Sequence, residues 1–171
     1  GKNTTGGAVN IISHDAKLGE NGGYFNVGYG NYNRVDANGA INLALGDTAA
    51  VRVAGTYSRT DGWFKNILPG YPDLAQTREY AFRGTFHWEP TERLKLVLRG
   101  SVSKQTPHNY GIYAQDENLE RIGGLDRYHI ASNIPTRRVA RTQSVALTAN
   151  YELTNTLTLT SITSYDHGTL Y

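Results

Sequence analysis

The stretch "EYAFRGTFHWEPTERLKLVLRGSVSK", residues 79–104, indicates how this chain folds. Large apolar side chains recur at alternate positions on both sides of a central turn at 89–93. They are Tyr80, Phe82, Phe86 and Trp88 before the turn, and Leu94, Leu96, Leu98 and Val102 after it. Polar or small residues fill most of the positions between them. Successive side chains of a strand point to opposite faces, so this pattern predicts a β-hairpin with one apolar and one polar face.

The same alternation returns along the rest of the chain in segments of about ten residues. Its apolar members are Phe25, Val27 and Tyr29; Ile41, Leu43 and Leu45; Val51, Val53 and Tyr57; Val145, Leu147, Ala149 and Tyr151; and Leu157, Leu159 and Tyr165. With the hairpin, these segments predict seven strands, at approximately 22–31, 35–45, 50–61, 78–88, 93–104, 141–152 and 156–167. The expected fold class is all-β, with antiparallel up-and-down strands.

The connections between these strands alternate in length. Turn-forming residues make short connections at 46–50, 89–93 and 153–156. Long connections are expected at 62–77 and 105–140, and only the first hairpin, around 31–34, is short on the side where the others are long. Short turns at one end and long loops at the other are typical of an outer-membrane barrel.

A soluble β-sandwich also produces period-2 alternation, so two architectures compete. Three features favour the membrane barrel. The segments are longer than the five or six residues typical of soluble strands. Their polar faces hold Asn, Thr, Ser, Ala and isolated Arg with little Lys or Glu. Tyr80 and Trp88 also stand eight residues apart, roughly 20 Å along a membrane normal and close to the ~25 Å apolar band of such barrels.

Composition excludes several classes of protein. The 171 residues include no cysteine, which rules out disulfides and thiolate zinc sites. No apolar run approaches the roughly 18 residues of a membrane-spanning helix. The formal net charge is +2, with both signs intermixed, so nothing points to a nucleic-acid partner.

The first residues, "GKNTTGGAVNIIS" (1–13), contain no initiator Met, basic n-region or apolar h-region, so they predict neither a natural N-terminus nor a signal peptide. They resemble the segment that closes the plug domain of TonB-dependent outer-membrane receptors and leads into the first barrel strand. The matching positions are Gly1, Lys2, Asn3, Thr5, Gly6, Gly7, Ala8, Asn10 and Ile11. Residues 22–45 are similar to the first barrel hairpin of these receptors, and "LTLTSITSYD" (157–166) to one of their recurrent strands.

This resemblance implies that residues 1–16 are the C-terminal end of a plug domain and that 17–171 form the first seven or so strands of a transmembrane barrel, about one third of it. The chain would then be a fragment of a receptor in the bacterial outer membrane. The implied function is TonB-dependent active uptake of a scarce nutrient, with a ferric siderophore as the expected ligand. The implied partners are outer-membrane lipid, the small-molecule ligand, and the TonB system through the missing N-terminal part.

No cofactor and no enzymatic activity are expected. The alternative is a passive porin or adhesin-type barrel without energy coupling. An outer-membrane enzyme would need a catalytic constellation, and we find none. The "SVSK" at 101–104 fits the S-x-x-K formula, but residues i and i+3 of a strand point to opposite faces. The five histidines show no metal-ligand spacing.

Two groups of candidate site residues remain. The long 105–140 connection offers aromatic, His and Arg side chains that suit a bulky anionic ligand, although a surface loop without a ligand role is the competing interpretation. They are His108, Tyr110, Tyr113, Tyr128, His129, Arg137 and Arg138. Arg52, Arg83 and Arg99 are expected to face the barrel lumen, either lining it for an anionic substrate or, as we favour, pairing with plug carboxylates.

Overall fold

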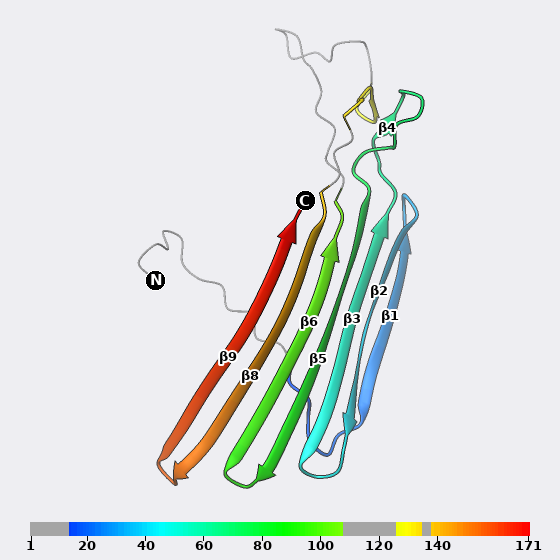
Figure 1. Ribbon diagram of the computed structural model, residues 1–171. Coiled ribbons are helices and arrows are strands. Elements are labelled where there is room, and N and C mark those ends of the chain that lie inside the picture. The colour runs from blue at the N-terminus through cyan, green and yellow to red at the C-terminus, as the bar shows by residue number, and fades with distance from the viewer. Residues whose placement is uncertain (1–13, 108–125, 135–137) are drawn as a thin grey trace.

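The computed structural model describes residues 14–107, 126–134 and 138–171, and within them seven strands form one antiparallel sheet in sequence order (Figure 1). These strands are β1 (Gly22–Gly30), β2 (Arg34–Ala44), β3 (Ala49–Thr60), β5 (Thr77–Thr91), β6 (Leu94–Gln105), β8 (Ala140–Thr154) and β9 (Leu157–Leu170). The sheet is not closed: β1 and β9 are its two edges. The expectation of an all-β, antiparallel, up-and-down fold is confirmed. No helix that could cross a membrane is present in the described part of the chain.

Strand register places the alternating apolar residues on one face of the sheet. Residues directly opposite each other in an antiparallel pair point to the same face, and Ile41 faces Val53, Phe86 faces Leu98, and Leu98 faces Leu147. We call this the apolar face. It carries Phe25, Val27, Tyr29, Ile41, Leu43, Val51, Val53, Tyr57, Tyr80, Phe82, Phe86, Trp88, Leu96, Leu98, Val102, Val145, Leu147, Ala149, Tyr151, Leu159 and Tyr165.

The opposite side, the polar face, carries the intervening residues. Among them are Asn26, Asn38, Asn42, Arg52, Thr56, Arg83, Thr85, Arg99, Ser101, Ser103, Thr142, Ser144, Thr148 and Asn150. Cross-strand hydrogen bonds join several of these side chains, such as Ser103 Oγ and Thr142 Oγ1 at 2.7 Å. The polar face therefore satisfies part of its hydrogen-bonding capacity within the sheet.

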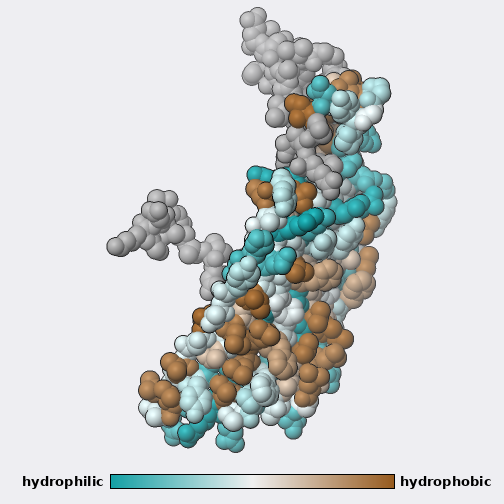
Figure 2. Space-filling view, viewed as in Figure 1, coloured by the Kyte–Doolittle hydropathy of each residue, from teal (hydrophilic) through white to brown (hydrophobic). Residues whose placement is uncertain are grey.

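The apolar face is exposed along its whole width. Phe25 is 74% exposed, Phe82 53% and Leu147 43%. Figure 2 shows hydrophobic surface over the lower and middle part of the sheet, with a hydrophilic band above it. Large apolar side chains are normally buried, and a contiguous exposed apolar surface marks a face that another apolar phase or partner covers.

Short turns close the lower end of the sheet in Figure 1. At the β2–β3 turn, the Leu45 amide donates to the Ala49 carbonyl at 2.8 Å, and Gly46 adopts a φ of 83°, which a residue without Cβ tolerates. β5 extends to Thr91, further than the expected end at residue 88, because a register shift between Trp88 and Thr91 lets the strand continue through Glu89 and Pro90. The bulge lies next to the turn, where it does not disturb the register of the rest of the strand.

Two additional strands join the long connections at the upper end of the sheet. β4 (Lys65–Asn66) and β7 (His129–Ile130) pair in parallel as a separate two-stranded sheet. The sequence did not predict them, because two residues cannot show a periodicity. Because β4 and β7 pair, the first and second long connections form one unit beyond the upper end of the sheet. We call it the loop unit (residues 61–76 and 126–134).

Candidate functional site

Residues 14–21, which we call the junction segment, pack against the polar face near the short turns (Figure 1). Ala16 is 1% exposed, and Ala50 and Val97 beneath this region of the sheet are 0% and 2% exposed. The most buried polar residues of the described strands lie here as well, with Thr85 and Asn42 both below 5%. The junction segment therefore forms a well-packed region together with β2, β3, β5 and β6, and a second buried group, Leu74, Ala75 and Ile130, lies in the loop unit.

Asn42 of β2 anchors the junction segment through three hydrogen bonds. Its Oδ1 accepts from the Lys17 amide at 2.9 Å, and its Nδ2 donates to the carbonyls of Lys17 at 2.9 Å and of Glu20 at 2.7 Å. Asn21 adds a fourth link, because its Oδ1 accepts from the Ala44 amide at 2.8 Å. Irregular backbone can be buried only when its polar groups find partners, and these side chains supply them.

His87 of β5 supports the same segment from the next part of the face. Its Nδ1 lies 2.9 Å from the Ala16 carbonyl oxygen. A carbonyl can only accept, so Nδ1 carries the hydrogen and donates it. Its Nε2 lies 2.9 Å from Glu89 Oε1. The buried ring thus links the junction segment to the bulged end of β5.

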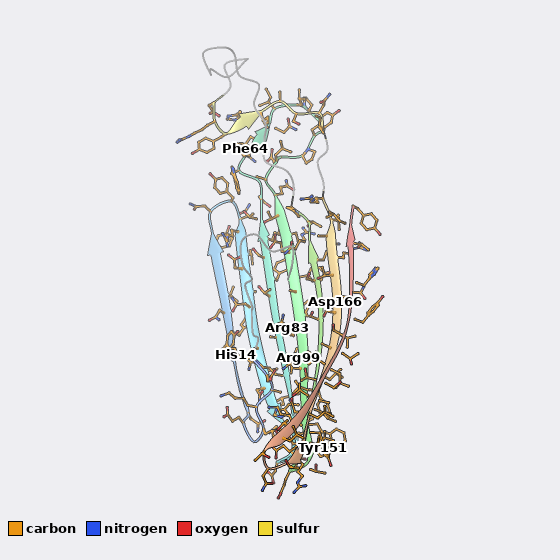
Figure 3. The ribbon with its side chains drawn as sticks, turned by 90° about the vertical axis from the view of Figure 1, so that its left-hand side faces the viewer. His14, Phe64, Arg83, Arg99, Tyr151 and Asp166 are labelled. Carbon is orange, nitrogen blue, oxygen red and sulfur yellow. The ribbon has the colours of Figure 1, made fainter. Side chains whose placement is uncertain are left out.

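Three arginines on adjacent strands surround Thr85 on the polar face. Arg52 and Arg99 both face Thr85 across the sheet, and Arg83 precedes it by two residues on β5. Among the described residues, a carboxylate contacts Arg99 alone of the three: its Nη2 and Nε lie 2.6 and 3.0 Å from Asp15 Oδ1, and its Nη1 donates to Thr148 Oγ1 at 3.2 Å. Figure 3 shows His14, Arg83 and Arg99 within the curve of the sheet.

Arg52 and Arg83 make no hydrogen bond or ion pair with any residue that the structure describes. Together with His14, Tyr24, Ala54 and Thr85 they line a pocket of about 230 Å³. Two guanidinium groups without a carboxylate create a positive potential that favours an anion, and their planar donors suit carboxylate or phosphate oxygens. We call this pocket, with Arg99 and Asp15 beside it, the arginine cluster.

The loop unit is held together by Asn66 and Asp73. The Asn66 side chain donates to the Ser132 carbonyl at 2.7 Å and accepts from the Ser132 amide at 3.2 Å. Asp73 contacts Lys65 Nζ at 2.6 Å and accepts from the Asn66 amide at 3.0 Å. Partial burial opposes ionisation of Asp73, but the hydrogen bonds from Lys65 and the Asn66 amide outweigh it and lower its pKa. The hydrogen bond from Asp73 in turn raises the pKa of Lys65.

The structure brings two of the loop candidates from the sequence into this unit. Tyr128 and His129 lie at β7, and the Lys65 amide donates to the Tyr128 carbonyl at 2.7 Å. His129 Nδ1 is 2.8 Å from Asp126 Oδ1, and this contact lowers the pKa of Asp126. Arg138 lies elsewhere, with its amide bonded to the Pro107 carbonyl at 3.4 Å. His108, Tyr110, Tyr113 and Arg137 lie outside the described residues, as do the candidate plug residues 1–11.

Asp15, Asn42 and His87 are site residues that the sequence did not single out. Asn42 and His87 occupy ordinary polar-face positions in the alternation, so no local signal separates them from their exposed neighbours. Within the described ranges, no group of three or more His, Asp or Glu side chains is placed to hold a metal ion. No family model, curated protein or solved structure matches this chain.

We expect Asn42→Ala to release the junction segment. The substitution leaves partly buried backbone groups of Lys17 and Glu20 without the Asn42 side chain as partner, at a cost of about 1–3 kcal/mol. Since about 1.4 kcal/mol corresponds to a factor of ten, hydrogen exchange of the Lys17 amide should accelerate by roughly five- to a hundredfold. Asn38→Ala is the matched control on the same strand and face, because Asn38 is exposed and, within the described residues, its side chain bonds only that of Asn26. Equal exchange in the two variants would contradict the anchoring role of Asn42.

The loop unit should open in acid. The pKa of Asp73 is lowered in the folded state, so its stabilising contribution is complete above the ordinary carboxyl range near pH 4 and is lost as the pH falls through the lowered value. Lys65 stays charged throughout this range. Spin labels on cysteines introduced at Ile67 and Ala131 should report a narrow distance distribution at pH 7 that broadens below about pH 4.

Asp73→Ala provides the control for this acid transition. It should give the broad distribution already at pH 7 and remove the pH dependence. A transition of unchanged midpoint in Asp73→Ala would show that another group, such as Asp61 or Asp126, controls the loop unit.

Proposed function

We propose that this chain joins the end of a plug domain to the first strands of the barrel in a TonB-dependent outer-membrane transporter, and that the whole protein takes up a scarce nutrient, with a ferric siderophore as the expected ligand. The observation that carries the proposal is the two-sided sheet. One face is apolar and exposed, and the other binds residues 14–21, which directly follow the plug-like motif of residues 1–13.

The apolar face supports the membrane part of the proposal. Exposing a Val, Leu, Ile or Phe side chain to water forgoes about 1.5–3 kcal/mol relative to burying it. Fourteen of the residues named above on the apolar face are of these four types. Hydrocarbon is the environment that removes this penalty without a second protein layer. Strands of 12–15 residues, as β3, β5, β6 and β8 are, suffice to cross a bilayer at a tilt.

Aromatic residues at both ends of the apolar face support the same interpretation. Tyr57 and Tyr80 face each other at the end from which the long connections leave, and Trp88 and Tyr151 lie toward the short turns. Tyr and Trp rings have an apolar body and a polar tip, which suits the two membrane–water interfaces. By this reasoning the long connections would lie on the external side and the short turns on the periplasmic side.

The polar face supports a plugged rather than an empty interior. The junction segment is bonded into it by Asn42, His87 and Arg99, and Arg52 and Arg83 remain without anionic partners among the described residues. A crowded interior that contains more of a plug would provide carboxylates for these arginines, and an anionic ligand in transit would meet the same charges. Both possibilities agree with uptake of an anionic ferric siderophore.

The membrane position of the sheet is tested by a pair of arginine substitutions on β6. Leu98→Arg places a charge on the apolar face between the levels of Tyr80 and Trp88, at a cost of about 2–4 kcal/mol near the bilayer midplane, and should block membrane assembly of the whole protein. Ser103→Arg places the same charge on the polar face, opposite Ala81 and Thr142, and should be tolerated. Heat-modifiable migration of membrane fractions measures assembly, and equal tolerance of both variants would contradict the proposed orientation.

Uptake itself is tested in cells that produce the whole protein. Accumulation of ⁵⁵Fe supplied as ferric siderophores should require the protein and should fall to the background level in an otherwise identical host without TonB. Cobalamin and oligosaccharides serve as alternative substrates. Accumulation that is independent of TonB and of the inner-membrane proton gradient would instead identify a passive porin.

A further inference from the structure

A row of four cations crosses the apolar face at the end from which the long connections leave. Arg59 of β3 faces Arg78 of β5, and Lys104 of β6 faces Arg141 of β8. Lys104 also faces Tyr80, which places the second pair beside the first. We call Arg59, Arg78, Lys104 and Arg141 the basic rim.

We propose that the basic rim binds the headgroup phosphates of a membrane lipid whose acyl chains lie along the apolar face below it. The proposal rests on the membrane position proposed above for the sheet. It adds the class of lipid that the apolar face and the basic rim recognise. It concerns the outside of the sheet, so it is independent of the ligand that the protein would transport.

Electrostatic repulsion within the basic rim favours an anionic partner. Like charges directly opposite each other on neighbouring strands are destabilising, and the basic rim contains two such pairs in succession. Asp61 neutralises Arg59 at 3.3 Å. The side chains of Arg78, Lys104 and Arg141 form no ion pair or hydrogen bond within residues 14–107, 126–134 and 138–171. A bound phosphate would remove this repulsion by accepting charge-assisted hydrogen bonds.

The positive charges of the apolar face lie at one of its borders. All the lysines and arginines that the seven described strands place on this face belong to the basic rim. The remaining strand cations, such as Lys95 and Arg99, lie on the polar face. Figure 2 shows the hydrophilic band at this level of the face. A cationic row at only one border of an apolar surface matches an anionic headgroup layer on one side of a bilayer.

The surface at the basic rim has two adjoining hollows. A pocket of about 260 Å³ lies at the rim and is lined by Arg59, Arg78, Lys104 and Tyr80. A shallow apolar groove of about 430 Å³ lies below it and includes Tyr57, Val53 and Phe82. Tyr57 and Tyr80 face each other, so the two hollows adjoin at this pair.

The groove exists because Gly39 and Gly55 face each other on the apolar face and leave no side chain between the rings of Phe25 and Phe82. A Cβ on Gly39 would lie 2.8 Å from the Tyr24 carbonyl oxygen, so the hollow is fixed by the backbone. A charged pocket that continues into an apolar groove fits a molecule with a phosphate at one end and an acyl chain at the other. A free inorganic anion has no apolar part that could contact the groove.

The test uses the intact protein that contains this chain, purified in a non-ionic detergent, with native mass spectrometry to count retained lipids. The probes are a bisphosphorylated diglucosamine lipid (lipid A), the same lipid with both phosphates removed, and phosphatidylcholine. We expect preferential retention of the bisphosphorylated lipid. Arg78→Ser with Arg141→Ser should lower that retention about tenfold or more, because each lost partner removes a hydrogen bond to a charged group.

Arg93→Ser with Lys95→Ser is the matched control, since it removes the same charge near a short turn and away from the basic rim. It should retain the bisphosphorylated lipid as the unsubstituted protein does. Three results would overturn the inference: equal retention of the lipid with and without phosphates, unchanged retention in the Arg78/Arg141 variant, or full displacement by millimolar inorganic phosphate alone.

Failure of the membrane proposal itself would look different. In that case the protein would stay monomeric in buffer without detergent and retain none of the three lipids. Retention of all three lipids without preference would agree with the membrane position of the sheet and would overturn only the role of the basic rim.

Discussion

One register, kept across seven strands, is the constraint on which the two-sided structure depends. Because side chains alternate with a period of two, a slip of one residue between any two strands would move every apolar side chain of one strand to the opposite face. The two register shifts in the large sheet lie between Trp88 and Thr91 and between Glu152 and Thr154, both beside short turns. Because both shifts lie at strand ends, they leave the side chains of the rest of each strand on their original faces.

The two faces then set opposite requirements. The apolar face needs only an apolar environment, and its exposed rings and aliphatic chains form few specific contacts. The polar face needs individual partners for its side chains, and the junction segment provides several, through Asn42, His87 and Arg99. This difference explains why the buried residues of the large sheet lie on the polar face, although most of the large apolar side chains lie on the other side.

The strands and the composition of their faces could be predicted from sequence because alternation is a local signal. Observed strand ends differ from the expected ones by at most three residues, and the largest differences are at the end of β5, which continues past Pro90, and at the end of β9. The β4–β7 pairing, the anchoring by Asn42 and the basic rim could not be predicted. Each depends on residues distant in sequence, and the rim in particular depends on which of Arg59, Arg78 and Lys104 face one another.

The distribution of paired and unpaired charges bears on where an anionic ligand would be held. In the described part of the loop unit, Lys65 pairs with Asp73, His129 contacts Asp126, and the Arg127 guanidinium lies 4.9 Å from the centre of the Tyr128 ring. The pKa values of Asp73 and Asp126 are lowered, so both carboxylates are ionised at neutral pH and neutralise most of the attraction that this region offers an anion. Arg52 and Arg83 lie on the polar face of the sheet, and the described part of the chain offers them no carboxylate partner. An anion that passes the loop unit would therefore gain more electrostatic free energy at the arginine cluster than among the loops, and this gradient would draw it inward toward the junction segment.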